Sequence, residues 1–114
     1  MKGLENIKLP GWGDKNPQQQ ENINEGVEQF RATPGAVLVD VRDASEFNSG
    51  HIPGAINCPL STIKDVAFSK DTTLFLYCLS GVRSKRAAAA LRQLGYTDVY
   101  SIGGIKQYTG ALEK

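Results

Sequence analysis

The fold is decided by one stretch of sequence, TTLFLYCLSGVRSKRAAAALRQL, which covers residues 72–94. Its first six residues form an apolar, partly β-branched run, which predicts a buried strand over 72–77. Its second half places alanine and leucine at helical spacing on one side and cationic residues on the other, which predicts a helix over 84–94. Gly95 follows, and glycine is the residue that most readily ends a helix in the left-handed conformation. A buried strand that leads through a short loop into a helix is typical of a parallel α/β sheet.

Three further apolar runs predict the other strands of this sheet. The longest is VLVDV at 37–41, whose nearly continuous apolarity suits a strand covered on both faces. Shorter runs at 55–58 and 99–102 are consistent with two more strands. A helix is predicted before the first of these strands, over 24–32, with Asn24 as its N-cap. Strands that alternate with helices in this order predict a three-layer α/β domain, with helices on both faces of a parallel sheet.

Length and composition exclude several classes of function. The chain has 114 residues, of which 40% are hydrophobic and 22% charged, and this balance predicts one globular domain with a core of its own. Thirteen Lys and Arg residues against 12 Asp and Glu leave a net charge of +1, which speaks against nucleic acid and anionic membranes as partners. Two cysteines and one histidine are too few for a disulfide framework or a zinc cluster. We therefore expect no metal and no cofactor.

Residues 1–20 are rich in glycine, proline and glutamine and show no apolar period, so we expect a leader or arm there and the domain itself over 21–114. Every apolar run is much shorter than the span of about 20 residues that is needed to cross a bilayer. No apolar stretch follows Lys2, as it would in a secretory signal. These features together predict a cytoplasmic protein whose cysteines are free thiols.

The loop after the decisive strand is the candidate site, because ligands of parallel α/β sheets bind where strands end and helices begin. Inward-facing amides and the positive end of the helix predict an anion-binding bowl around Cys78, and Gly81 permits the unusual dihedrals of such a loop. This setting favours a thiolate, so Cys78 is predicted to be a nucleophile. The predicted substrate-binding residues are the rest of the loop: Leu79, Ser80, Gly81, Val82, Arg83 and Ser84.

Simpler interpretations stay open at this point. A cysteine at a strand end can be a small buried apolar residue without chemistry. Arg83 can be an exposed residue at the start of a helix, or a residue that supports the loop, instead of one that fixes a bound anion.

Several motifs, in this order, resemble those of a single-domain rhodanese, a sulfurtransferase: Asp40-Val41-Arg42, Glu46-Phe47, GHIPGAIN at 50–57, the Cys78 loop and Gly103-Gly104. The resemblance runs from about residue 21 to the end. It implies a five-stranded parallel sheet flanked by helices, with a short first strand near 21–23. It also implies that a donor such as thiosulfate or a protein persulfide loads sulfur on Cys78, that a thiol or cyanide accepts it, and that no cofactor takes part.

The resemblance also implies roles for residues outside the loop. His51 is expected to stabilise a turn and not to form a catalytic dyad with the cysteine. Asp40, Arg42 and Glu46 are expected to be hydrogen-bonding groups of the scaffold near the pocket floor. Cys58 is expected to pack in the core, with a resolving thiol as the less favoured interpretation.

The chain departs from the family pattern at two places. Many members carry a basic residue directly after the cysteine, where this chain has Leu79, so its loop is less positive. A tryptophan commonly follows the glycine pair, where this chain has Ile105 and Tyr108, and we expect this departure to affect packing.

Loop length separates sulfur transfer from phosphate chemistry. Cysteine-based phosphatases place five residues between cysteine and arginine, whereas this chain has the four residues 79–82. The shorter loop narrows the ring of amides, which favours a single sulfur atom over a phosphoryl group. Two alternatives remain: a catalytically quiet rhodanese-like module that binds a partner protein, against which the intact Cys78 argues, and, less favoured, a cysteine-based phosphatase or arsenate reductase.

Overall fold

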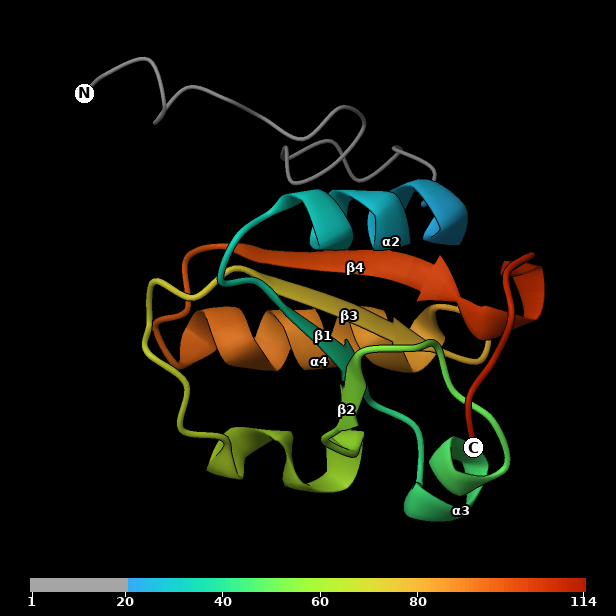
Figure 1. The fold of residues 1–114 in the computed structure, drawn as a ribbon. Coiled ribbons are helices and arrows are strands. Elements are labelled where there is room, and N and C mark those ends of the chain that lie inside the picture. The colour runs from blue at the N-terminus through green and yellow to red at the C-terminus, as the bar shows by residue number, and fades with distance from the viewer. Residues whose placement is uncertain (1–20) are drawn as a thin grey trace.

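A computed structural model describes residues 21–114, which form a parallel sheet with helices on both faces (Figure 1). The predicted leader over 1–20 lies outside the described residues. No helix within 21–114 has the length and apolar character needed to cross a membrane. In chain order, the elements are α2 (Ile23–Ala32), β1 (Val37–Asp40), α3 (Ala44–Asn48), β2 (Ala55–Asn57), the 3-10 helix η1 (Leu60–Asp65), β3 (Leu74–Cys78), α4 (Val82–Gln93), β4 (Val99–Gly104) and the 3-10 turn η2 (Ile105–Gln107).

The sheet of the described residues has four strands in the order β2-β1-β3-β4, all parallel, so the expected fifth strand is wrong. Residues 21–23 were expected to form that strand, but Ile23 already begins α2. The cause is the helix cap: the Asn22 side chain accepts hydrogen bonds from the backbone amides of Asn24, at 3.1 Å, and Glu25, at 3.2 Å. The N-cap predicted at Asn24 is therefore two residues too late.

Alternation of side chains along β3 divides the core into two clusters, one on each face of the sheet. Phe75 and Tyr77 pack on the α2 side, and Leu74, Leu76 and Cys78 pack on the α4 side. The alanine face of α4 lets the helix lie close against that second cluster, as the sequence predicts. The side chain of Cys78 consequently points toward the start of α4.

The pairing of β3 with β4 shifts register by one residue near the site. Leu76 pairs with Ser101, whereas the next residue, Tyr77, pairs with Gly103, so β4 contains one extra residue at this point. The shift places Gly104 opposite Cys78. The carboxyl ends of these two strands thereby form the support on which the Cys78 loop lies.

Candidate active site

Cys78 is the last residue of β3, and only 1% of its surface is exposed. Its Sγ accepts hydrogen bonds from the backbone amides of Gly81, at 3.0 Å, and Ser84, at 3.4 Å. The chain turns back over the sulfur because Gly81 adopts a φ of +105°, and α4 begins at the next residue. Two amides and the positive end of a helix therefore converge on one sulfur atom, an arrangement that stabilises negative charge there.

The loop lies directly on the end of β4. A Cβ atom built on Gly104 would lie 2.2 Å from the carbonyl oxygen of Leu79 and 2.6 Å from Cα of Ser80. The same carbonyl of Leu79 accepts a hydrogen bond from the amide of Lys106 at 3.3 Å. Only glycine fits at position 104, and Gly103 before it has a φ of +120°, a conformation that favours glycine.

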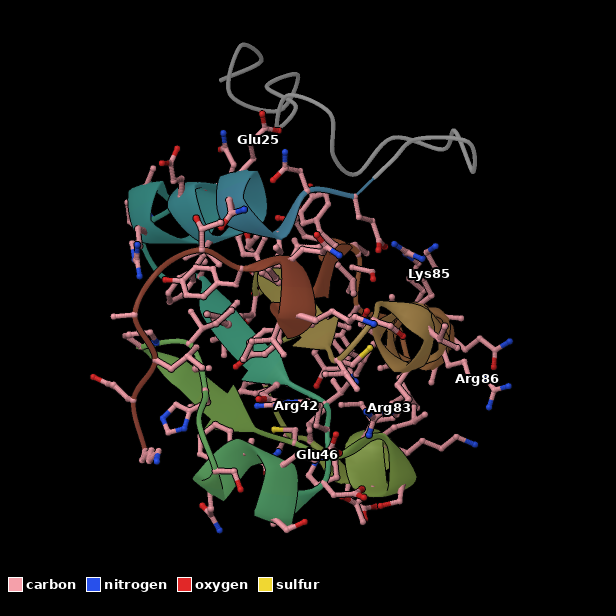
Figure 2. The ribbon with its side chains drawn as sticks, turned by 90° about the vertical axis from the view of Figure 1, so that its right-hand side faces the viewer. Glu25, Arg42, Glu46, Arg83, Lys85 and Arg86 are labelled. Atoms are coloured by element: carbon pink, nitrogen blue, oxygen red, sulfur yellow. The ribbon has the colours of Figure 1, made fainter. Side chains whose placement is uncertain are left out.

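The rim of the loop is apolar and exposed. Leu79 exposes 43% of its surface and Val82 exposes 60%, and Ser80 between them is exposed as well. Lys85 and Arg86 extend outward from the first half of α4, close to this rim in sequence (Figure 2). A molecule that approaches the sulfur first meets apolar side chains with cations near them.

Arg83 is held by Glu46, which lies on the short helix α3 (Figure 2). Its Nη1 and Nη2 donate to the two carboxylate oxygens of Glu46 at 2.8 and 3.1 Å, and Glu46 also accepts from the amide of Asp43 at 3.0 Å. The hydrogen bond from Arg83 lowers the pKa of Glu46 to about 2. The Arg83 guanidinium thus connects the start of α4 to α3. Loop support and anion binding, the two roles predicted for Arg83, are proposals.

The expected scaffold residues make the hydrogen bonds of a scaffold. Asp40 is buried and accepts from the side chain of Arg42 at 2.6 to 3.0 Å, and Arg42 donates onward to the carbonyl of Gly50 at 2.8 Å. His51 contacts the carbonyl of Phe47 through Nδ1 at 2.9 Å and stacks on its ring at 3.8 Å. These contacts are those of a turn-stabilising histidine.

Cys58 lies outside the Cys78 loop, directly after β2. It is partly buried against the apolar cluster on the α4 side, and burial raises the pKa of its thiol. These surroundings suit the core-packing role expected of Cys58. Like Cys78, it is a free thiol.

Two residues next to the loop were not singled out by the sequence. Ser101 Oγ lies 2.7 Å from Ser84 Oγ, and Glu21 lies on the other side of the loop, next to Gly103 and Gly81. An oxygen of Glu21 also lies 3.0 Å from where a Cβ on Gly81 would be. Burial raises the pKa of Glu21. The three residues are far apart in the chain and meet only in the fold, so no local pattern marks them.

Comparison with known proteins identifies the family. The rhodanese-like domain family matches residues 20–111. The uncharacterized protein YqhL of Bacillus subtilis is 44% identical over 90 residues, which cover 75% of this chain and 71% of that protein. Thiosulfate sulfurtransferase GlpE of Pseudomonas savastanoi is 44% identical over 72 residues, covering 61% and 68% respectively.

More distant matches agree with this assignment. A tRNA uridine(34) hydroxylase of Erwinia tasmaniensis is 37% identical over 84 residues, which cover 66% of this chain but only 24% of that longer protein. The solved structure of a rhodanese with anions from E. coli superposes with a TM-score of 0.64 and 32% identity, covering 69% of this chain and 98% of the other. The chain therefore belongs to the rhodanese-like domain family.

Proposed function

We propose that the chain is a sulfurtransferase that carries a sulfane sulfur as a persulfide on Cys78. The observation that carries this proposal is the position of the Cys78 sulfur at the start of α4, where it receives the amides of Gly81 and Ser84. The 44% identity to a relative named thiosulfate sulfurtransferase supports the same chemistry.

Sulfur transfer would proceed in two displacements at the outer sulfur atom. In the first, the Cys78 thiolate attacks the terminal sulfur of thiosulfate, the S–S bond of the donor breaks, and sulfite leaves with the bonding electron pair. In the second, cyanide or an acceptor thiolate attacks the outer sulfur of the persulfide, and the Cys78 thiolate is the leaving group. The loop amides stabilise the negative charge on sulfur in both steps.

The geometry of the loop favours sulfur over phosphate. The amides of Gly81 and Ser84 are directed at Sγ itself, at 3.0 and 3.4 Å. A phosphoryl group would need additional donors placed around three oxygens beyond the sulfur, and the loop has only four residues between Cys78 and Arg83 in which to supply them. We therefore expect no phosphatase activity.

The partners that fit this chemistry are a small sulfur-containing anion or a protein persulfide as donor, and a thiol or cyanide as acceptor. The mechanism consumes and regenerates a free thiolate, so it requires conditions that keep thiols reduced. The cytoplasm provides them, and we propose it as the location.

The test is the thiosulfate:cyanide sulfurtransferase assay on two matched variants. Cys78→Ser should reduce activity to the background rate, because an alcohol neither ionises at neutral pH nor holds a sulfane sulfur. Cys58→Ser should retain the wild-type rate, because Cys58 lies outside the loop and packs, partly buried, against the apolar cluster on the α4 side. After incubation with thiosulfate, mass spectrometry should find the mass of one added sulfur atom in the wild type and in Cys58→Ser, and none in Cys78→Ser.

Two results would contradict the proposal. Equal loss in both variants would make Cys58 a partner in transfer and end the single-nucleophile mechanism. A wild-type protein that takes up no sulfur from thiosulfate or from a persulfide donor would favour the quiet, partner-binding module instead.

A further inference from the structure

Exposed apolar side chains gather at the Cys78 loop. Within residues 21–114, the large apolar side chains with the greatest exposure are Ile56, Leu79, Val82 and Leu112. Leu79 directly follows Cys78, and Val82 is the first residue of α4. Exposed apolar residues that lie together mark a binding surface more often than single ones do. The loop that holds the sulfur therefore also offers an apolar contact to an incoming molecule.

The outward face of α4 continues this apolar contact with cations. Lys85 and Arg86 follow Val82 at three and four residues, the spacing of neighbours on one helix face, and both are exposed. Figure 2 shows both side chains extending outward from α4. Since a helix rises 1.5 Å per residue, the two cations lie about 5–6 Å along the axis from Val82. The rim strip, as we call this surface, consists of Leu79, Val82, Lys85 and Arg86.

The positive charge of the rim strip is only partly balanced by the carboxylates around it. Arg83 is paired with Glu46 at 2.8 Å, whereas neither Lys85 nor Arg86 forms an ion pair with another residue of 21–114. Glu21, whose carboxylate lies beside the loop, offsets part of the charge of Lys85. The rim strip as a whole therefore attracts negative charge.

A further cation flanks the loop on the side of β4. Lys106 is exposed, and its backbone amide donates to the carbonyl of Leu79 at 3.3 Å, so its side chain begins next to the rim. A molecule that covers the loop thus meets positive charge on both sides and apolar groups between them. Thiosulfate is too small to touch all of these groups at once, so the arrangement fits a longer molecule.

The chemistry of the rim strip favours an acidic protein segment over a nucleic acid. Unpaired bases bind proteins largely by stacking on aromatic rings, whereas the strongly exposed large apolar residues of 21–114 are all aliphatic. Aliphatic side chains pack well against those of a peptide. Cys78 is 1% exposed, so a partner must reach its sulfur with a narrow group, and a cysteine side chain on a flexible segment is such a group.

We propose that the rim strip is the docking surface for a partner protein that exchanges sulfur with Cys78 through a cysteine on a flexible, acidic segment. The segment carries an aliphatic side chain next to its cysteine. Its carboxylates lie two to three residues away, because two extended residues span up to about 7 Å and so reach the cations of α4. This inference rests on the proposed function and deepens it, since it names the class of the partner.

Sulfur exchange with the docked segment follows the chemistry of any thiol acceptor. The thiolate of the segment attacks the outer sulfur of the Cys78 persulfide, the S–S bond of that persulfide breaks, and the Cys78 thiolate leaves with the electron pair. The segment then carries the persulfide. A segment that donates sulfur runs the same steps in reverse, so one docking surface serves both directions.

The test measures sulfur transfer from protein preloaded with thiosulfate to three short synthetic peptides that differ only in charge. Each peptide has a central cysteine with a leucine beside it, and its flanking positions hold glutamate, glutamine or lysine. The readout is the ratio of the second-order rate constants for the glutamate and glutamine peptides, which cancels any general effect on the chemistry. Binding is measured separately, by fluorescence anisotropy of a labelled glutamate peptide with serine in place of its cysteine.

Two kinds of variant test the two parts of the rim strip. Lys85→Glu combined with Arg86→Glu reverses its cations, and Val82→Ser removes an apolar contact. The matched control for the cations is Arg31→Glu combined with Lys70→Glu, which makes the same change in net charge at exposed positions. Arg31 lies in the last turn of α2, before β1 begins, and Lys70 precedes β3, so both lie toward the opposite ends of the strands from Cys78.

We expect the wild type to prefer the glutamate peptide over the glutamine peptide on the order of fivefold at low salt, because several exposed charge pairs act together. The lysine peptide should be the slowest of the three, and the preference should fade as salt screens the charges. Reversing Lys85 and Arg86 should abolish or invert the preference, whereas the control should keep it. Val82→Ser should weaken binding of the labelled peptide about two- to threefold, since part of an apolar contact is lost.

Equal transfer to all three peptides by the wild type would overturn the docking surface and leave the proposed function intact. A wild-type preference in the variant with Lys85 and Arg86 reversed would also overturn it. Peptide binding that depends on these cations, in a protein that transfers no sulfur, would keep the docking surface and refute the proposed function. Tighter binding of a labelled oligouridine strand than of the glutamate peptide, at the same salt, would overturn the assignment to a protein segment in favour of RNA.

Discussion

Leu79 directly follows Cys78, the proposed nucleophile, and projects from the loop with 43% of its surface exposed. It gives the rim an apolar group where a cation would attract an anionic donor, and Arg83, the nearest cation in the loop, is already bound to Glu46. At the scale of single residues, we therefore expect the rim to favour donors that carry apolar surface over a small dianion.

This difference predicts the effect of Leu79→Arg on thiosulfate kinetics. The added cation should lower the KM for thiosulfate about two- to fivefold, which corresponds to about 0.5–1 kcal/mol of attraction at an exposed site. The value of kcat should change little, because the charge acts on bound substrate and transition state alike. Steady-state kinetics at low and high salt are the measurement.

Salt is the control for this variant, because screening weakens an electrostatic gain and leaves a packing change intact. Leu79→Met, which keeps the apolar rim, should match the wild type at both salt concentrations. A kcat/KM of Leu79→Arg equal to that of the wild type at low salt would show that Leu79 serves to pack the loop.

At the scale of the elements, the β3–α4 loop packs closely against the end of β4. The backbone of Leu79 and Ser80 occupies the space where a side chain at position 104 would be. The register shift between β3 and β4 is what brings this glycine beside Cys78. The shape of the sulfur site thus depends on a strand that contributes no reacting atom.

Gly104→Ala should therefore displace the Cys78 loop from its position on β4. A methyl group 2.2 Å from the carbonyl of Leu79 forces the loop to move, at a cost of about 1–3 kcal/mol in the free energy of unfolding, as in other overpacked sites. Because the amides of Gly81 and Ser84 move with the loop, sulfur transfer should fall further than the loss of folded protein explains. Chemical denaturation and the sulfurtransferase assay on the same samples measure both.

Lys106→Ala is the control for the Gly104 variant. Lys106 is exposed and its contact with the loop is made by its backbone amide, which the substitution preserves. Unchanged activity in Gly104→Ala would show that the loop tolerates displacement and that its contact with β4 is not needed for catalysis.

For the molecule as a whole, the sequence predicts the layers of the fold and the position of the Cys78 loop, but not the contacts between segments that are distant in the chain. The apolar run before Cys78 and the alanine face after it are local patterns, and both predicted elements are found within about two residues of their expected bounds. The strand expected at 21–23 was predicted wrongly, because the Asn22 side chain caps a helix that begins at the next residue. The contact between Ser84 and Ser101 depends on the packing of α4 against β4, which no local pattern encodes.

The short helix α3 was not predicted, although the sequence contains a signal for it. Asp43 and Glu46 have the spacing of residues that cap a helix, and the bond from the Asp43 amide to Glu46 is present, so this signal was available. The hydrogen bond between Glu46 and Arg83 could not be predicted from the sequence, because it joins two helices, α3 and α4, that are separated in the chain by β2 and β3.

The ion pair between Glu46 and Arg83 predicts how stability of the whole chain depends on pH. Folding lowers the pKa of Glu46 from its ordinary value of 4.5 to about 2, so ionisation of Glu46 favours the folded state above pH 4.5. That contribution fades as the pH falls from 4.5 toward 2. Glu46→Gln should cost about 1 kcal/mol or less at neutral pH, because both partners are partly exposed, and almost nothing near pH 2.

Urea unfolding across this pH range is the measurement, and Glu28→Gln, an exposed position of α2, is the matched control. A difference between Glu46→Gln and wild type that stays constant from neutral pH to pH 2 would show that the ion pair does not act through ionisation of Glu46.

The burial of Cys78 also constrains which molecules can reach it. With 1% of the residue exposed, a flat protein surface cannot bring its own sulfur into contact with Sγ. Two copies of the chain cannot approach to the about 2.05 Å of a disulfide through this residue while both stay folded. The protein is thereby protected against oxidative cross-linking to itself at Cys78, the thiol that we propose carries the sulfur. A protein that donates or receives sulfur here must present it at the tip of a slender, flexible segment that projects from its own surface.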